Sequence, residues 1–498
     1  MTPESAPSPF PSTRRWWGSV RVALALLALA GGVYWMRRLY VRSWFRDGPP
    51  RVVSCRSVDP ATPPALLGRL RVVLVDGLSL AAADALPELR SLCDRGLSLD
   101  LDVGFPSISL PVQHALWTGA WQQRTGVLFR EEGLAKPVVP SLVEVVRAAG
   151  GTAIAVAEGY RHLVASFPFA QIVAPARRGE LFAPTVMRRE VARASASSAA
   201  LVFVHLLAVD RAGHLHGGAS PEYRWAAEAA GRVVGQVAAA RRTGETVVVL
   251  SDHGHLAEGG HGGLEREVRY VRACAVGAGL PAGTRRAAAI PELATLFAGQ
   301  LGVPPPPCAE GRTREALLAG APAPLPPAPP ERSAAEWAWL LAPLLLVVPF
   351  RRGLRGVRRA GLAALLALPW SLACATGTVW LVYGAPSLSR AYVYPALPGK
   401  LLLASLVALP VLGLQLVGLA RLGLTIARRA LLLALSSLAP GLALLCASGA
   451  PWRTPPLDAV WTPWASTALG VGLALLGGLA LSALWPLSEG GAPRSGGR

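Results

Sequence analysis

The sequence is short of charge. Only 16% of its 498 residues are charged, against about 25% in a typical soluble protein, while 52% are hydrophobic. The net charge of +19 belongs mainly to the two ends: residues 1–51 contribute +6, residues 331–498 contribute +10, and residues 52–330 only +3. Arginines that flank apolar segments give this distribution. A nucleic-acid-binding domain would need a basic surface of its own, so nucleic acid is excluded as a partner.

Cysteine is also scarce, and no two of the six cysteines have the spacing of a C-x-x-C metal or redox motif. Cys374 and Cys446 fall in apolar segments. The other four are Cys55, Cys93, Cys274 and Cys308. These four could pair outside the cytoplasm, and the sequence leaves open which pairs form or whether any does.

Apolar segments predict an integral, multi-pass membrane protein. Residues 1–51 contain one signal-anchor helix at about 20–36, with no cleavage site directly after it. Residues 334–498 are predicted to form a membrane domain of about five spans, at 337–350, 360–383, 401–420, 430–450 and 465–487. None of these spans contains an ionisable side chain, which argues against a transporter and favours an anchor or a lipid-facing platform.

The arginine-rich loops predict the orientation of the chain. Loops 351–359 and 421–429 collect arginines and should be cytoplasmic, so the region before residue 334 faces away from the cytoplasm. Residues 52–316 are therefore expected to form an extracytoplasmic domain, periplasmic or lumenal, with the bacterial inner membrane as the expected location. A Pro-rich linker over 317–333 would join this domain to the membrane block.

The middle region alternates short β-branched runs with helical stretches. The runs 71–75, 152–156, 201–206 and 246–250 predict buried strands of a mostly parallel sheet. Segments 141–149 and 222–240 predict helices between them. The predicted fold class is α/β, a mostly parallel sheet flanked by helices, accompanied by an α-helical transmembrane domain.

Carboxylates and imidazoles follow three of these runs. They are Asp76 after the first, Asp210 and His214 after the third, and Asp252, His253 and His261 after the fourth. The carboxyl ends of parallel strands meet at one edge of a sheet, so these side chains should gather there. Each alone would more often belong to a turn, but together they suit two zinc-like ions, which accept both ligand types.

The candidate nucleophile is a serine just before a helix that is expected over 112–117. Ser109 stands two residues before Pro111, near the start of a helix over 112–117. A serine at this place is ordinarily an N-cap. A helix N-terminus and an adjacent metal would also favour an ionised hydroxyl, and the two roles are compatible.

These motifs together resemble the alkaline phosphatase superfamily. They read VDGL at 75–78, FPSISLP at 105–111, HLLAVDRAGH at 205–214, SDHG at 251–254 and HGG at 261–263. They are most similar to the type I phosphodiesterase/nucleotide pyrophosphatase branch, and the layout of the chain is most like that of the GPI ethanolamine phosphate transferases. The resemblance implies an alkaline-phosphatase-like enzyme that acts on a phosphorylated lipid or glycan head group, phosphoethanolamine being one candidate, through a phospho-Ser109 intermediate.

The resemblance also implies two divalent ions and a role for each motif. One zinc ion would be held by Asp76, Ser109, Asp252 and His253, and the other by Asp210, His214 and His261, with manganese as an alternative in one site. The family's asparagine after the motif proline is Val112 here, so the substrate would be held by Gln113, His114, His216 or backbone N–H groups. A sulfatase motif would need arginine in place of Gln113.

Two other functions stay open at this stage. The first is a nucleotide pyrophosphatase or phosphomonoesterase that acts on soluble substrates and is merely anchored by its helices. The second is a non-catalytic membrane scaffold, which should have lost ligands that are all present here. Among the remaining histidines, His205 is expected in the core or behind a ligand. His255 could contact substrate or lie in a solvated loop, and His162 could line the pocket or cap a loop.

Overall fold

The structure is a computed structural model that describes residues 66–128, 139–177 and 179–326. It also describes the single positions Val20, Leu24, Leu27, Ala28, Gly31, Cys55, Ser389 and Leu403. The predicted anchor helix, the predicted membrane spans and the end of the predicted linker lie outside the described residues, apart from those positions. None of the helices in the described ranges is both long and apolar enough to cross a membrane. The chain divides into two compact units, and the domain described below belongs, with Ser389, to one of them.

The centre of the domain is an eight-stranded sheet in the order β4-β3-β5-β1-β6-β7-β2-β8. The strands are β1 (Arg69–Val75), β2 (Leu97–Asp102), β3 (Ala153–Ala157), β4 (Gln171–Val173), β5 (Leu201–Leu206), β6 (Glu245–Leu250), β7 (Tyr270–Val276) and β8 (Thr284–Ala289). All neighbours pair in parallel except β7, which runs antiparallel to both β6 and β2. The prediction of a mostly parallel α/β sheet flanked by helices is confirmed.

The four predicted strands form the middle of this sheet. β1 pairs with β5 on one side and β6 on the other, and β3 lies beyond β5. β5 and β6 are buried along their whole length. Their mostly apolar sequences are explained by helices on both faces, since a strand covered on two sides has no face toward solvent.

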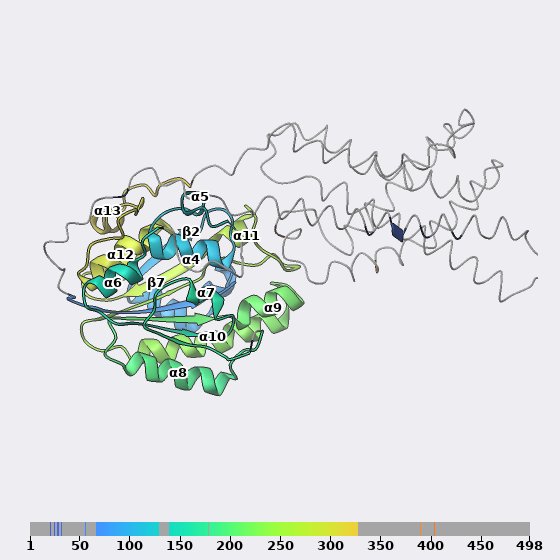
Figure 1. The fold of residues 1–498 in the computed structure, drawn as a ribbon, viewed down its shortest axis with the longest axis horizontal. Helices are drawn as coiled ribbons and strands as arrows, with labels where there is room; N and C mark the ends of the chain where they lie inside the picture. Colours follow the sequence, from blue (N-terminus) through green and yellow to red (C-terminus); the bar gives the residue numbers. More distant parts are fainter. Residues whose placement is uncertain are drawn as a thin grey trace, which may run out of the picture. The chain divides into compact units, whose positions relative to one another are not determined.

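Helices cover both faces of the sheet. The helices are α2 (Leu80–Ala85), α3 (Pro87–Asp94), α4 (Ser109–Thr118), α5 (Gln122–Thr125), α6 (Leu142–Ala148), α7 (His162–Ala165), α8 (Pro184–Ala196), α9 (Ala208–His216), α10 (Pro221–Ala239), α11 (Arg266–Arg269), α12 (Glu292–Leu301) and α13 (Arg314–Ala319). One apolar cluster joins the sheet to α4, α6 and α12, and a second joins it to α3, α8 and α10 (Figure 1). The predicted helices at 141–149 and 222–240 correspond to α6 and α10.

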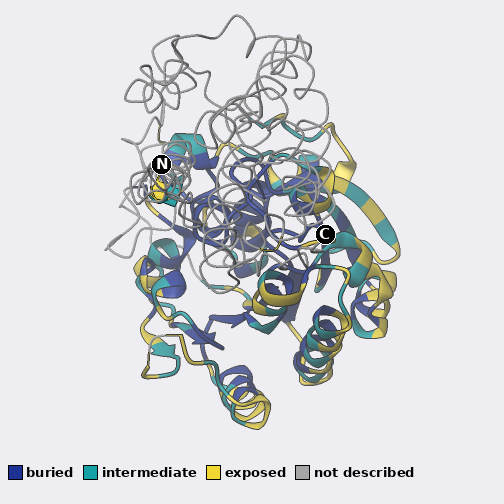
Figure 2. Cartoon of the chain, turned by 90° about the vertical axis from the view of Figure 1, so that its right-hand side faces the viewer, coloured by how far each residue is buried: buried dark blue, intermediate teal, exposed yellow. Residues whose placement is uncertain are grey.

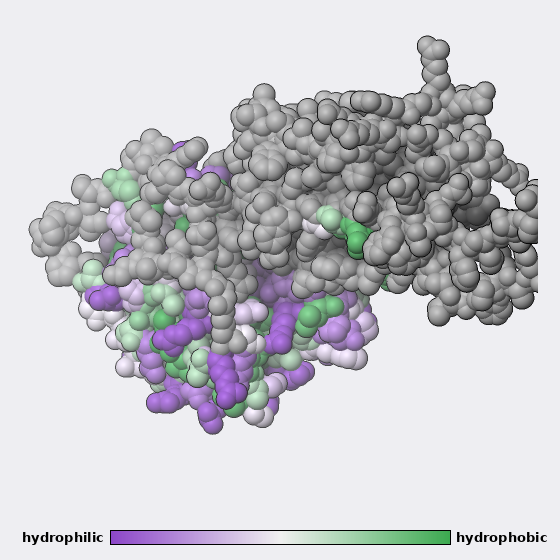
Figure 3. Space-filling view, turned by 45° about the vertical axis from the view of Figure 1, so that its right-hand side comes forward, coloured by the Kyte–Doolittle hydropathy of each residue, from purple (hydrophilic) through white to green (hydrophobic). Residues whose placement is uncertain are grey.

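Burial follows these layers. The strands are dark in Figure 2, while the helices carry exposed residues on their outer faces. Trp117 of α4 is fully buried, and its ring meets those of Phe203 and Phe297 at centroid distances of 5.1 and 6.0 Å. The face in Figure 3 shows hydrophilic side chains with scattered apolar ones, as is usual for the outside of an α/β domain. Because Trp117 is packed inside the domain, the helix that starts at Ser109 is anchored in the core.

Two disulfides tie distant parts of the domain together. Cys55 pairs with Cys308, and Cys93 of α3 pairs with Cys274 of β7. The sequence left the pairing open. A bond across 181 residues restricts the unfolded chain far more than the folded one, so it stabilises the fold.

Removing the second disulfide should therefore lower the stability of the domain. For the double variant Cys93→Ala and Cys274→Ala we expect the free energy of unfolding to fall by about 3 kcal/mol. Thermal unfolding of parent and variant, with and without reductant, measures the effect. An unchanged melting temperature in the variant would show that this bond contributes nothing to the stability of the fold.

Candidate metal centre

The carboxyl ends of three neighbouring strands carry the predicted ligands. Asp76 follows β1 directly, Asp252 and His253 follow β6, and Asp210 and His214 lie one turn apart in α9, which follows β5. The turn after Asp76 is tight, because a Cβ atom on Gly77 (φ +74°) would lie 2.8 Å from the Cα atom of Asp210. Glycine lets the loops approach closely, and the carboxylates therefore share one site.

Ser109 faces this site. It is the first residue of α4, whose N-cap is Ile108 and has no side-chain capping bond, so Ser109 is not the N-cap that its position suggested. Its hydroxyl lies 3.3 Å from Asp76 Oδ1 and 3.3 Å from His253 Nε2. The residue is only 4% exposed. A hydroxyl held between a carboxylate and an imidazole is oriented and can pass on its proton, as a nucleophile requires.

The first group of ligand atoms gathers around Asp210. The Nε2 atoms of His214, His255 and His261 lie 3.2, 3.1 and 3.4 Å from Asp210 Oδ1. His214 Nε2 and His261 Nε2 are themselves 3.1 Å apart. All four residues offer one atom each within 4.8 Å of the others. The group contains the three predicted ligands Asp210, His214 and His261, together with His255, which was not predicted as a ligand.

The second group gathers around Asp76. His205 Nε2 lies 2.8 Å from Asp76 Oδ2, and Asp76, His205 and Asp252 form one set of neighbouring ligand atoms. A further set joins Asp76 and Asp210 to His253, whose Nε2 atom lies 3.3 Å from Asp76 Oδ1. The predicted ligands are thus all brought together, and Asp76 and Asp210 link the two groups.

Three buried carboxylates give the centre a local excess of negative charge that a bound cation would balance. Asp76, Asp210 and Asp252 are fully or almost fully buried. Burial and the charge of Asp76 raise the pKa of Asp252 to about 7, because carboxylates in one desolvated site resist joint ionisation. Although burial lowers it, the charges of Asp252 and Asp76 raise the pKa of His253 to about 10.

The unsatisfied atoms of the centre fit a divalent metal. Asp252 Oδ2 is buried and has no hydrogen-bond partner in the described part of the chain. The close Nε2 atoms of His214 and His261 both face the same Asp210 oxygen. Crowded lone pairs of carboxylate oxygen and imidazole nitrogen are what a zinc-like ion satisfies. The residues present therefore fit a bound divalent metal.

The three predicted substrate-binding residues lie around this cluster, outside its sets of ligand atoms. Gln113 is fully buried, with its Nε2 atom 3.4 Å from His205 Nε2. His114 is fully buried against Phe167, at a centroid distance of 4.9 Å, and burial lowers its pKa to about 3. His216 is exposed at the end of α9. His114 thus belongs to the core, and His216 is the member of the three that solvent reaches.

One histidine of the cluster was underestimated from the sequence. His205 was expected in the core or behind a ligand, and its burial and its bond to Asp76 agree with that expectation. His255 was expected to contact substrate or to lie in a solvated loop; it lies in a loop but is buried against Gly213, where a Cβ atom would lie 2.5 Å from the imidazole ring. Its place two residues after His253 was the available signal, but only the fold shows that its ring turns toward Asp210.

Replacing His255 tests its part in the centre. We expect His255→Ala to weaken zinc binding by about 10- to 100-fold, because Asp210 loses a bond that orients it and the cluster loses an imidazole. His216→Ala removes an exposed histidine of the neighbouring helix end and should leave affinity unchanged. Competition with a chromogenic chelator measures both. Equal affinities in the two variants would place His255 outside the metal centre.

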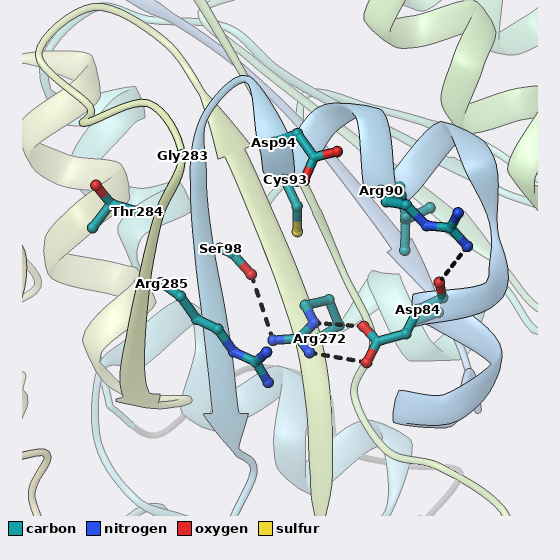
Figure 4. Close-up of a pocket in the computed structure, with 11 residues that line it drawn as sticks. Asp84, Arg90, Cys93, Asp94, Ser98, Arg272, Gly283, Thr284 and Arg285 are labelled. Carbon is teal, nitrogen blue, oxygen red and sulfur yellow. Dashed lines mark hydrogen bonds and ion pairs between the residues drawn. The ribbon is translucent and has the colours of Figure 1, made fainter.

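Another charged hollow of the domain is built from ion pairs. Arg272 is 4% exposed and bonds to Asp84 (Figure 4). Arg272 and Arg285 both bond to Asp100 as well. These arginines cross-link β2, β7 and β8 to α2. Because their charges already have carboxylate partners, this hollow has a structural explanation, and the centre around Asp76 is the stronger candidate for chemistry.

Part of the domain that holds this centre matches a known protein family. Residues 157–264 match the model of the type I phosphodiesterase/nucleotide pyrophosphatase family. The matched segment contains Asp210, His214, Asp252, His253 and His261. This match confirms the resemblance noted in the sequence, and the geometry adds Asp76 and Ser109 from outside the matched segment.

Several solved structures match about half of the chain. Murine ectonucleotide pyrophosphatase/phosphodiesterase 5 is 13% identical, covering 48% of this chain and 96% of its own, with a TM-score of 0.40. An alkaline phosphatase superfamily protein from Vibrio parahaemolyticus is 13% identical, covering 55% and 76%, with a TM-score of 0.39. The C-terminal periplasmic domain of EcEptC from Escherichia coli, in complex with zinc, is 14% identical, covering 51% and 87%, with a TM-score of 0.37. No curated protein sequence matches the chain.

Proposed function

We propose that this protein is a two-zinc phosphodiesterase or phosphotransferase that acts on a phosphorylated head group of a lipid or glycan. The observation that carries the proposal is the position of the Ser109 hydroxyl, 3.3 Å from both Asp76 and His253 inside a buried cluster of carboxylates and imidazoles. Asp76, Ser109, Asp252 and His253 would hold one ion, and Asp210, His214 and His261 the other.

Ser109 makes the first bond of the reaction. Its oxygen attacks phosphorus in line, the bond from phosphorus to the leaving oxygen breaks, and the products are a phosphoserine and an alcohol that takes up a proton. An acceptor hydroxyl, from water or a second head group, then attacks the phosphoserine and releases Ser109. Asp76 and His253 orient the serine oxygen, and its proton leaves to solvent as the bond to phosphorus forms. Divalent ions bound here would supply the positive charge that opposes charge developing on the phosphoryl oxygens.

The start of α4 provides donors for the phosphate. Val112, which replaces the family's asparagine, is buried and has no polar group. No side chain caps the helix at Ile108. Pro111 has no N–H group and the Val112 N–H group bonds to the Ile108 carbonyl, so the donors that the first turn can offer are the N–H groups of Ser109 and Leu110. A helix N-terminus binds phosphate oxygens well. Backbone donors therefore replace the missing side chain in this proposal.

The cysteines and the predicted apolar segments support the proposed location. Disulfides persist in oxidising compartments, and the domain has two of them. With the predicted spans on both sides of the domain, this favours a periplasmic or lumenal domain tethered to a membrane, in our proposal the bacterial inner membrane. Tethering would raise the local concentration of a head group carried on lipid.

The test uses the purified full chain in detergent. We expect about two zinc ions per chain and hydrolysis of bis-nitrophenyl phosphate in preference to nitrophenyl phosphate. Release of phosphoethanolamine from phosphatidylethanolamine vesicles would identify a lipid head group. Cleavage of a dinucleotide with no action on vesicles would favour a soluble nucleotide substrate, to which the family match also points. A metal-free and inactive chain would favour the scaffold.

A further inference from the structure

A serine from far along the chain contacts the loop that carries one of the metal ligands. Ser389 lies beyond the Pro-rich segment and is fully buried. Its hydroxyl accepts a hydrogen bond from the Gly263 N–H group at 2.9 Å and donates one to Glu265 Oε2 at 2.6 Å. Both partners follow closely after His261. The hydroxyl of Ser389 thus uses its donor and an acceptor on a single loop.

The loop between His261 and Glu265 is also fixed from its other side. The hydroxyl of Ser107 donates to the Gly263 carbonyl and accepts from the Gly262 N–H group, both at 3.0 Å. The carbonyl of Ser107 bonds to His261 Nδ1 at 2.9 Å. The bond from the Ser107 carbonyl to Nδ1 orients the His261 ring, whose Nε2 atom faces Asp210. Ser107 and Ser389 therefore hold the same short loop between them, and the loop sets the place of His261.

Ser389 donates a hydrogen bond to the carboxylate of Glu265. Glu265 is the N-cap residue of α11, but its side chain makes no capping bond. Its Oε1 atom is buried without a hydrogen-bond partner among the described residues, and its Oε2 atom bonds to Ser389. A carboxylate whose oxygens leave water must be met by donors. Without Ser389 this carboxylate would turn away, and the start of α11 and the loop before it would lose their support.

Gly263 shows that the contact requires close approach. A Cβ atom on this residue would lie 2.7 Å from the Ser389 hydroxyl and would also collide with the Glu265 carboxylate. A glycine at this position lets the hydroxyl reach the backbone N–H group. Alanine at 263 should therefore disturb the same contact from the opposite side.

We propose that Ser389 is a positioning residue of the metal centre, holding the Gly263–Glu265 loop so that His261 keeps its place. The proposal rests on the proposed function, because it takes the centre to bind metal. Ser389 falls between the predicted spans 360–383 and 401–420, in a loop predicted to face the same side of the membrane as the domain. The C-terminal part of the chain would then be a component of the centre, in addition to any role as an anchor.

The first arm of the test measures retention of zinc in the full chain. We expect Ser389→Ala to lose zinc to a chromogenic chelator about tenfold faster than the parent, since residues that hold a ligand in place typically change affinity by that much. Glu265→Gln should also lose zinc faster than the parent. The double variant should lose zinc little faster than either single variant, because both substitutions disrupt the same contact between Ser389 and Glu265. Ser387→Ala, from the same segment, is the matched control and should behave as the parent.

The second arm tests proximity without metal or substrate. In the double variant Ser389→Cys and Glu265→Cys, a short thiol cross-linker should join the two positions in both zinc-loaded and zinc-stripped protein, and mass spectrometry should identify the linked peptides. Absence of the link in zinc-loaded protein, or a link combined with unchanged zinc loss in Ser389→Ala, would overturn the positioning role. A parent chain that binds no zinc would refute the proposed function instead, while the link would still decide the contact.

Discussion

Ser109→Ala should remove diester hydrolysis almost entirely, by at least about 10⁴-fold, while most of the bound metal stays. The loss is large because no other hydroxyl in the described part of the chain lies between Asp76 and His253. The metal stays because the remaining carboxylates and imidazoles still offer ligand atoms within 4.8 Å of one another. Initial rates and zinc content, measured on the same preparation, check both halves of this prediction.

The matched control for this variant is Ser107→Ala. Ser107 is equally buried and only two residues away, but its hydroxyl bonds to the backbone of Gly262 and Gly263. Its loss should lower activity far less, by about tenfold, because it supports a ligand and forms no bond to phosphorus. Rapid quenching should give a phosphopeptide containing Ser109 in Ser107→Ala and none in Ser109→Ala. The reverse pattern would assign the nucleophile to Ser107.

The centre of the sheet could be predicted from sequence, but its far edge could not. β1, β5 and β6 consist mostly of consecutive apolar residues, which predict strands covered on both faces. β2 reads LSLDLD and β8 reads TRRAAA, so each mixes residues that are uncommon in buried strands. Their conformation depends on ion pairs such as Arg272 with Asp100, on the pairing of β2 with β7 and on the pairing of β8 with β2. These are tertiary contacts that a local pattern does not contain.

The candidate site shows the same division. Asp76, Asp252 and His253 could be placed together because each follows a parallel strand, and the carboxyl ends of such strands share an edge. His255 joins Asp210 through the direction in which its loop turns, and spacing alone does not determine that direction. Ser389 comes from a segment separated from the domain by more than the Pro-rich linker, so nothing in its local sequence connects it with His261.

Removing the metal should destabilise the domain and should do so in a pH-dependent way. A cation that binds the folded chain alone stabilises it by about 2.7 kcal/mol at a hundred times its dissociation constant. For a domain of this size that is a rise in melting temperature of about 5–10 °C. Binding must displace a proton from His253, whose pKa is about 10, and below neutrality one from Asp252, whose pKa is about 7.

The sign of the pH effect follows from those two protons. As the pH falls from 8 to 6, more protons compete for the ligand atoms, so zinc affinity should drop by at least about tenfold per pH unit. Thermal unfolding of zinc-loaded and chelator-stripped protein at both pH values measures this. The matched variant Asp252→Asn keeps the shape but has no proton to displace, so its affinity should be lower at pH 8 and should depend less on pH. A melting temperature that chelation leaves unchanged at pH 8 would mean that the buried carboxylates need no cation, and the two-metal mechanism would then have to be abandoned.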